Sequence, residues 1–170
     1  RRTRGLVAQH SQRDAVLAEV NGLVPDANVI GEPEGRNTAP CIGLAAVHLL
    51  RDDPDAVMAV LPSDHLIRPD AVFRDALSQA AQLVADDPQR LLLFGVRPTY
   101  PATGFGYIEA GAGRDDLFVK AKRFVEKPGA EKAVEYLASG KYYWNSGMFI
   151  WSVKSLESAF RKHRPPPSNS

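Results

Sequence analysis

Short apolar runs and longer amphipathic stretches alternate along the first hundred residues of the chain. Apolar runs bounded by turn residues predict strands at Gly5–His10, Asn28–Gly31, Ala56–Leu61 and Arg90–Val96. Apolar residues at helical spacing predict helices between them, at Asp14–Val20, Cys41–Arg51 and Pro69–Ala85. Alternation of helices with strands that are apolar on both faces is typical of a parallel sheet covered by helices.

The pattern changes after the Arg90–Val96 strand. Strands are predicted at Phe105–Glu109 and Leu117–Val125, and the glycine-rich turn Gly111-Ala112-Gly113 between them indicates an inserted β-hairpin. The remaining predicted elements are a helix at Ala130–Ala138, an aromatic strand at Tyr143–Val153 and a helix at Ser155–Lys162. We therefore predict an α/β fold with a mostly parallel sheet, flanking helices and an inserted β-hairpin.

Composition narrows the class of protein. A chain of 170 residues with 44% hydrophobic residues can form one domain with a real core. A net charge of +1 gives no global attraction to nucleic acid or to a membrane surface, and no apolar run approaches the ~20 residues of a membrane helix. The one cysteine, Cys41, excludes an internal disulfide and suits a reducing compartment. We expect a cytoplasmic protein with neither nucleic-acid nor membrane partners.

A carboxylate follows the third predicted strand. The run Ala56–Leu61 ends in Pro62-Ser63-Asp64-His65, which places Asp64 beyond the carboxyl end of the strand. Ligands of open α/β sheets bind outside the carboxyl ends of the strands. Asp64 is therefore a candidate to hold a metal ion on a phosphate, and an orienting role is favoured for His65 over general-base work.

The loop Gly35–Pro40 is a second candidate. A glycine-containing turn, the basic residue Arg36 and the start of a helix together supply free backbone N–H groups and positive charge. This combination suits a phosphate or the edge of a nucleobase. An ordinary loop with a capped helix has the same pattern, and spacing alone does not choose between the two.

Three further segments break the local pattern. Glycines flank an aromatic residue in Thr103–Tyr107, which permits either close ligand approach or an ordinary bulge. The pair Glu126-Lys127 at a strand end suits binding of hydroxyls and a phosphate. The alternative is a surface ion pair that contributes little to stability. The polar triplet Asn145-Ser146-Gly147 interrupts an aromatic strand, and such local inconsistencies tend to be functional.

Five motifs, taken in order, resemble the sugar nucleotidyltransferase family over most of the chain, between residues 5 and 163. They are VLPSDH, EPEGRNTAP, RPTYPATGFGYIE, FVEKP and YYWNSGMFIW. Within that family the combination is similar to the branch of mannose-1-phosphate guanylyltransferases. The resemblance implies a Rossmann-like nucleotidyltransferase fold. It also implies GTP and mannose 1-phosphate as substrates, Mg²⁺ as cofactor, and GDP-mannose and pyrophosphate as products.

The resemblance assigns roles to matching positions. It implies that Asp64 binds the catalytic Mg²⁺ and that Lys127 lies near the sugar phosphate, so both are expected to be catalytic. The implied guanine-nucleotide contacts are Arg36, Asn37, Thr38 and Ala39. The implied sugar-binding positions are Gly104, Tyr107, Glu126 and Asn145.

The chain also departs from the family pattern. The glycine-rich phosphate loop with which the family opens is absent, and so is the second metal-binding aspartate that the family places beyond the aromatic strand. We therefore expect residues 1–163 to be a partial nucleotidyltransferase domain without activity by itself, and residues 164–170 to be a disordered tail. A non-catalytic sugar-phosphate-binding or structural module remains an alternative, as does a nucleotidyltransferase for another sugar or base. An exposed sheet edge would allow a homo-oligomer.

Overall fold

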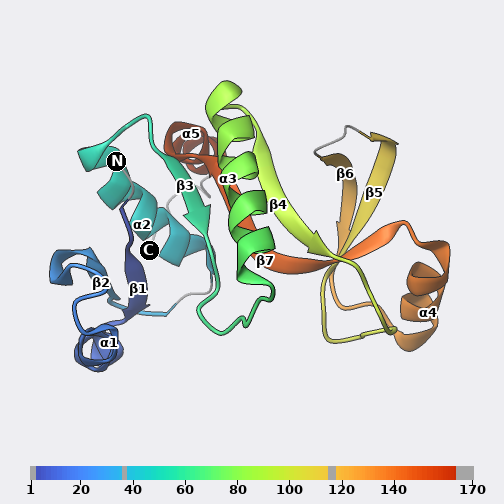
Figure 1. Ribbon diagram of the computed structural model, residues 1–170, viewed down its shortest axis with the longest axis horizontal. Helices are drawn as coiled ribbons and strands as arrows, with labels where there is room; N and C mark the ends of the chain where they lie inside the picture. Colours follow the sequence, from blue (N-terminus) through green and yellow to red (C-terminus); the bar gives the residue numbers. More distant parts are fainter. Residues whose placement is uncertain (1–2, 36–37, 115–117, 164–170) are drawn as a thin grey trace, which may run out of the picture. The chain divides into compact units, whose positions relative to one another are not determined.

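The computed structural model describes residues 3–35, 38–114 and 118–163 (Figure 1). Its strands are β1 (Leu6–Gln9), β2 (Val29–Glu32), β3 (Val57–Val60), β4 (Leu91–Val96), β5 (Tyr107–Arg114), β6 (Val119–Val125) and β7 (Tyr142–Ser152). Its α-helices are α1 (Arg13–Val20), α2 (Thr38–Asp52), α3 (Asp70–Asp86), α4 (Ala130–Ser139) and α5 (Val153–His163). Each predicted strand and helix is confirmed in type, and short 3-10 turns occur at His10–Gln12 and Asp26–Asn28.

Contacts divide the chain into two compact units. The first unit comprises Arg1–Met58, Ala81–Arg90 and Trp151–Ser170, and the second comprises Ala59–Ala80 and Leu91–Ile150. Every site residue expected after position 58 therefore belongs to the second unit. In the described part of the chain, no helix combines the length and apolarity that a membrane span requires.

The first unit contains a parallel strand pair. β1 and β2 pair from Leu6 opposite Val29 to Gln9 opposite Glu32, and α1 forms the crossover between them. Arg13 of α1 donates a hydrogen bond from Nε to the Val29 carbonyl at 3.0 Å. Val29 is buried beneath this contact, so the side chain of Arg13 fastens the helix to the strand. The predicted strand–helix–strand alternation is confirmed here.

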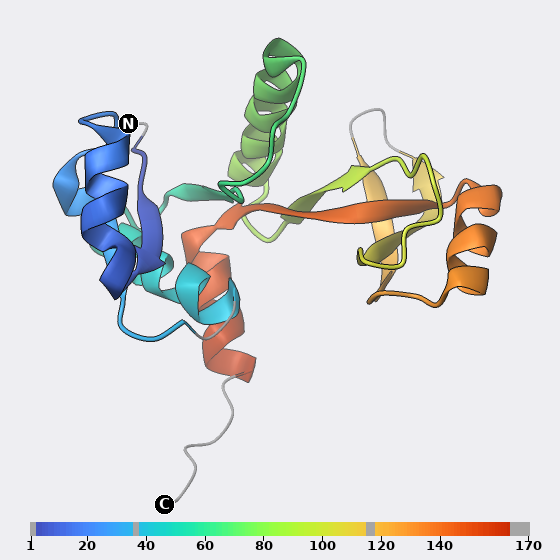
Figure 2. The ribbon, with the colours of Figure 1, turned by 90° about the horizontal axis from the view of Figure 1, so that it is seen from below.

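Helices α2 and α5 pack together in the same unit (Figure 2). A Cβ placed at Gly43 would stand 3.6 Å from the Phe160 ring, so the missing side chain lets the helices approach closely. α2 begins at Thr38, and the predicted start at Cys41 is three residues late. Pro40 explains the difference, because its fixed backbone angle and missing N–H suit a first helical turn.

The second unit is built on the larger sheet, in the order β3-β7-β5-β6 with β4 also paired to β7. β5 pairs antiparallel with both β6 and β7, so the inserted hairpin is confirmed. The expectation of a mostly parallel sheet is wrong for these pairs, because β6 and β7 both run back along β5. The predicted turn at Gly111–Gly113 lies within β5, where register shifts absorb the glycines.

The strands β5, β6 and β7 present two different faces. Residues that pair directly across antiparallel strands point to the same side. Tyr107 and Glu109 share one face, and Tyr136 of α4 packs against it: the Tyr136 ring lies 5.4 Å from the Tyr107 ring and stacks on Tyr142 at 3.9 Å. Gly106 alternates with Tyr107 and so faces the other side. The fold thus separates a packed face from a second face that carries the polar motifs.

Candidate functional site

The loop after β3 carries Asp64 on the surface of the second unit. The side chain of Asp64 is 85% exposed, and its Oδ1 lies 3.8 Å from Nε2 of His65. Among the described residues no group of three or more histidine, cysteine or acidic side chains is arranged to hold a metal. A single exposed carboxylate nevertheless fits Mg²⁺, which commonly takes one or two protein carboxylates together with water and substrate phosphates.

This loop meets the polar interruption of β7. A Cβ placed at Gly147 would stand 3.7 Å from Cγ of Pro62, two residues before Asp64. Gly147 adopts a φ of +71°, a conformation that glycine reaches without the steric cost of other residues. The predicted break in β7 is therefore a real bend, and it lies against the loop of the candidate metal ligand.

Side chains of β7 hold the bend through main-chain hydrogen bonds. Oδ1 of Asn145 accepts from the Gly147 N–H at 3.1 Å. Oγ of Ser146 donates to the Phe94 carbonyl of β4 at 2.6 Å and accepts from the Met148 N–H at 3.2 Å. The oxygen of the Asn145 amide is thus engaged locally, and its NH₂ group, which has no partner among the described residues, can donate to a ligand.

Three of the motifs come together on the open face of the hairpin. The Asn145 N–H donates to the Gly106 carbonyl at 2.8 Å. A Cβ at Gly106 would stand 3.1 Å from Oε2 of Glu126 and 3.6 Å from Cβ of Asn145. A side chain at residue 106 would therefore enter the space between the Glu126 carboxylate and the Asn145 side chain. The sequence singled out Gly104, beside which a Cβ would meet nothing within 4 Å. The presence of two glycines was visible, but which of them borders Glu126 was not.

Lys127 stands at the end of β6 in a rare backbone conformation. Its φ is +37°, which costs energy for any residue with a Cβ. It precedes Pro128, which ordinarily pushes its neighbour toward extended backbone. Its Nζ lies 3.7 Å from Oε1 of Glu126, and both side chains are mostly exposed. The turn carries an acid and a base side by side at the open face.

Tyr107 supports the glycine-rich loop from the packed face. Its side chain is completely buried, and its hydroxyl donates to the Ala102 carbonyl at 2.8 Å. Phe105 and Tyr100 lie against Trp144, with ring centroids 5.2 and 4.9 Å away. Tyr107 therefore lies in the segment expected to line a sugar pocket, but its ring and hydroxyl are used inside the protein.

An ion-pair network lies on the packed face. Glu109 accepts hydrogen bonds from Nζ of Lys122 at 2.7 Å and from Nε of Arg123 at 2.5 Å. These bonds, led by that of Lys122, lower the pKa of the Glu109 carboxyl to about 2. Arg123 also donates to the Tyr142 hydroxyl at 2.9 Å, which links all three strands of the hairpin region. The network therefore cross-links β5, β6 and β7, and we interpret its role as structural.

The segment expected to bind a nucleotide lies in the first unit. Arg36 and Asn37 fall outside the described residues. Thr38 and Ala39 form the first turn of α2, and both are exposed. The first turn of a helix offers unpaired backbone N–H groups and a positive dipole end, which suit an anion. The predicted loop-to-helix arrangement is present as far as it is described.

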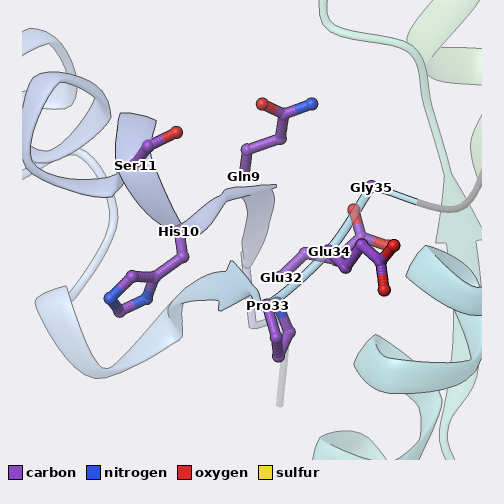
Figure 3. A pocket seen from close by; sticks show the side chains of 7 residues that line it. All are labelled: Gln9, His10, Ser11, Glu32, Pro33, Glu34 and Gly35. Atoms are coloured by element: carbon purple, nitrogen blue, oxygen red, sulfur yellow. The ribbon is translucent and has the colours of Figure 1, made fainter.

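A cavity of about 400 Å³ precedes this segment, at the carboxyl ends of β1 and β2 (Figure 3). It is lined by Gln9, His10, Ser11, Glu32, Pro33, Glu34 and Gly35. Oε1 of Glu32 is buried and has no hydrogen-bond partner among the described residues. A buried acceptor without a partner is rare in proteins and calls for an explanation. Glu32 was not among the predicted site residues, and only its place at a strand end could have marked it.

Cys41 of α2 is no candidate nucleophile. Burial raises the pKa of its thiol, and the negative charge of Glu32 raises it further. A thiol whose pKa is raised stays protonated at neutral pH and is a poor nucleophile. Its place in α2 fits the packing role that its sequence context favoured.

Comparison with known proteins identifies the relatives of the chain. A family model described as nucleotidyl transferase matches residues 3–165. The xanthan biosynthesis protein XanB of Xanthomonas campestris is 48% identical over 144 residues, which are 85% of this chain and 30% of that protein. A mannose-1-phosphate guanylyltransferase of Klebsiella pneumoniae is 48% identical over 152 residues, or 88% of this chain and 31% of the relative. The chain thus spans about 30% of the length of these relatives.

Solved structures with a similar fold also carry names of mannose-phosphate enzymes. The mannose-1-phosphate geranyltransferase of Thermus thermophilus matches with a TM-score of 0.83 and 31% identity. The match covers 93% of this chain and 44% of that one. The mannose-6-phosphate isomerase of Helicobacter pylori matches with a TM-score of 0.77 and 35% identity, over 94% of this chain and 59% of the other. The α/β architecture expected from the sequence is confirmed by these neighbours.

Proposed function

The chain belongs to the nucleotidyl transferase family, and from that premise we propose that its complete gene product makes GDP-mannose from GTP and mannose 1-phosphate. The observation that carries the proposal is the open space at Gly106, between the Glu126 carboxylate and the Asn145 side chain. Carboxylate and amide groups that converge on one small open space suit the hydroxyls of a sugar. The choice of mannose as the sugar and guanine as the base follows the names of the relatives.

The proposed reaction is a single displacement at phosphorus. A phosphate oxygen of mannose 1-phosphate attacks the α-phosphorus of GTP, and pyrophosphate leaves. Such a transfer needs positioning and neutralisation of charge rather than a covalent enzyme intermediate. The described residues fit this demand, because they offer hydrogen-bonding and charged groups and no activated nucleophile.

The sugar phosphate is proposed to bind on the open face of the second unit. Glu126 accepts hydrogen bonds from sugar hydroxyls, and Asn145 donates from its NH₂ group. Lys127 contributes positive charge toward the sugar phosphate, and its strained backbone directs the side chain from the end of β6. Gly104 belongs to the loop beside this face, and Tyr107 fixes that loop from beneath.

Asp64 is proposed as a ligand of Mg²⁺. The metal, when bound, would neutralise negative charge on the phosphates of the nucleotide. The proximity of Pro62 to Gly147 supports this assignment, because it places the loop of Asp64 near the strand that carries Asn145.

The nucleotide is proposed to bind at the start of α2 through Arg36, Asn37, Thr38 and Ala39. We assign the base to the neighbouring cavity, where Oε1 of Glu32, which has no partner among the described residues, is a suitable acceptor. Guanine has a ring N–H and an amino group on the same edge, and a carboxylate can accept from both. The other proposed attributes are a cytoplasmic location, no nucleic-acid or membrane partner, and homo-oligomers as a possible assembly.

The test is release of pyrophosphate by the purified complete gene product. With GTP, mannose 1-phosphate and Mg²⁺ we expect turnover, and we expect at least about tenfold less with ATP or UTP or with glucose 1-phosphate. A preference for another nucleotide or sugar would replace the substrate assignment. Binding of mannose 1-phosphate by calorimetry without turnover of any nucleotide would show a sugar-phosphate-binding module instead of an enzyme.

A further inference from the structure

We propose that Ser146 is a positioning residue for the sugar-phosphate site, because its hydroxyl holds the bend of β7 on which Asn145 and Gly147 stand. This inference rests on the proposed function of the same site. Ser146 does not contact the ligand in this assignment. Its role is to fix two neighbours, one that faces the sugar and one that touches the loop of Asp64.

The hydroxyl of Ser146 makes two hydrogen bonds within the protein and has no proton left to donate to a ligand. It donates to the Phe94 carbonyl of β4 at 2.6 Å and accepts from the Met148 N–H at 3.2 Å. Both partners are main-chain groups in part-buried surroundings, where an unpaired polar group is costly. The hydroxyl therefore joins β7 to β4 and also bridges two residues of β7 at the point where this strand bends.

The bend determines the positions of the two neighbours of Ser146, Asn145 and Gly147. On one side the main-chain N–H of Asn145 donates to the Gly106 carbonyl at 2.8 Å, which keeps Cβ of Asn145 beside the open space at Gly106. On the other side Gly147, with a φ of +71°, lies against Pro62. A shift of Ser146 would move both contacts, because all three residues are consecutive.

The packing beyond the bend keeps its far side fixed. Met148 and Ile150 are buried in the continuation of β7. Removal of the Ser146 hydroxyl is therefore expected to release the bend toward Asn145 while the rest of the strand stays in place. Small displacements of positioned groups have large effects on reaction rates, up to about 10²-fold per ångström.

Ser152 provides a matched control on the same strand. It is buried, donates from Oγ to the Pro88 carbonyl at 3.1 Å and accepts from the Ser155 N–H at 3.0 Å. Its hydroxyl thus makes the same two kinds of bond as that of Ser146, but none of the proposed ligand contacts lies beside it. A loss that reflects folding alone should be similar in Ser146→Ala and Ser152→Ala.

The experiment compares steady-state kinetics of the complete gene product and its variants. Ser146→Ala is expected to raise the KM for mannose 1-phosphate about tenfold while the KM for GTP changes less than about twofold. Ser146→Thr keeps the hydroxyl and is expected to restore most of the loss. Ser152→Ala is expected to leave both KM values within about twofold of the wild type. If Ser146→Ala does not fold, Gly147→Ala tests the same bend through its backbone and should raise the same KM.

The outcomes separate the two proposals. A wild type that turns over mannose 1-phosphate, with Ser146→Ala and Ser152→Ala alike in both KM values, overturns the role of Ser146 alone. Loss of GTP and sugar affinity in equal measure also overturns it. A wild type that neither binds nor turns over mannose 1-phosphate overturns the proposed function, and the inference about Ser146 falls with it.

Discussion

The single residue with the sharpest expected effect is Gly106. A Cβ there would stand 3.1 Å from Oε2 of Glu126 and would occupy the space proposed for sugar hydroxyls. We predict that Gly106→Ala weakens mannose 1-phosphate binding at least about tenfold, with little change in thermal stability, because Glu126 is exposed and can move aside. Isothermal calorimetry and a melting curve measure the two quantities.

Substitutions at two other glycines test whether the effect is specific to Gly106. A Cβ at Gly129, before α4, would meet nothing within 4 Å, so Gly129→Ala is the matched control and should bind normally. Gly104→Ala decides which glycine of the motif borders the sugar. Stronger loss at Gly104 than at Gly106 would contradict the placement of the site beside Glu126.

The backbone of Lys127 is predicted to lower stability while it places a positive charge at the site. Its φ of +37° disfavours any residue with a Cβ, so Lys127→Gly should be more stable than Lys127→Ala by about 1 kcal/mol. Both variants lose the positive charge and should lose activity to a similar degree. Urea denaturation gives the stability difference, and equal stability of the two variants would show that the backbone at this position is unstrained.

The sequence marked the residues of the candidate site, whose roles stay predictions, but it did not show how those residues lie relative to one another. The sequence marked Asp64, Glu126, Lys127 and Asn145, because each breaks a local pattern at a strand end or within a strand. It did not mark Glu32, whose Oε1 is buried and has no hydrogen-bond partner in the part of the chain that the structure describes. Burial depends on contacts between segments far apart in the chain, and a local pattern carries no information about them.

At the scale of secondary-structure elements, the β5–β6 hairpin depends on the ion pairs of Glu109. The pKa of this carboxyl is lowered to about 2, well below the ~4.3 of an unfolded glutamate. A lowered pKa means that the charged form is favoured in the folded state, so its contribution is complete above about pH 5. We predict that this contribution is lost as the pH falls from about 4.5 to about 2.

The check is the pH dependence of thermal unfolding for the wild type and Glu109→Gln. The variant should be less stable at about pH 7, and the difference should shrink toward zero near about pH 2. Glu135→Gln is the control, because Glu135 forms an exposed pair with Lys132 at 2.9 Å on α4. A constant difference across the pH range would mean that the Glu109 charge contributes nothing to the hairpin.

Element types were predictable because each depends on local periodicity. The sequence patterns of the long helices α2 and α3 and of the near-continuous apolar strands are each typical of one element type. The errors fall where pairing decides the outcome. Gly111 was assigned to a turn, but it lies within β5 at a register shift, and a Cβ there would stand only 2.9 Å from the Lys120 carbonyl oxygen of β6. Strand direction in the larger sheet escaped prediction for the same reason.

At the scale of the whole molecule, the proposed ligands divide between the two units. The cavity of Glu32 and the first turn of α2 belong to the first unit, whereas Glu126, Asn145 and Asp64 belong to the second. Each unit has its own packed interior, around Val29 in the first and around Tyr107 in the second. A change in one ligand contact is therefore expected to leave the binding of the other ligand largely intact.

This division gives a prediction about affinity for each substrate. Glu32→Gln keeps the shape of the side chain but replaces one acceptor oxygen with a donor group, which opposes the donor edge of guanine. It should weaken GTP binding at least about tenfold and leave mannose 1-phosphate binding within about twofold, as measured by calorimetry. Glu126→Gln should do the reverse. If either variant weakened both ligands equally, the two contacts would not be independent, and the assignment of base and sugar to separate units would be wrong.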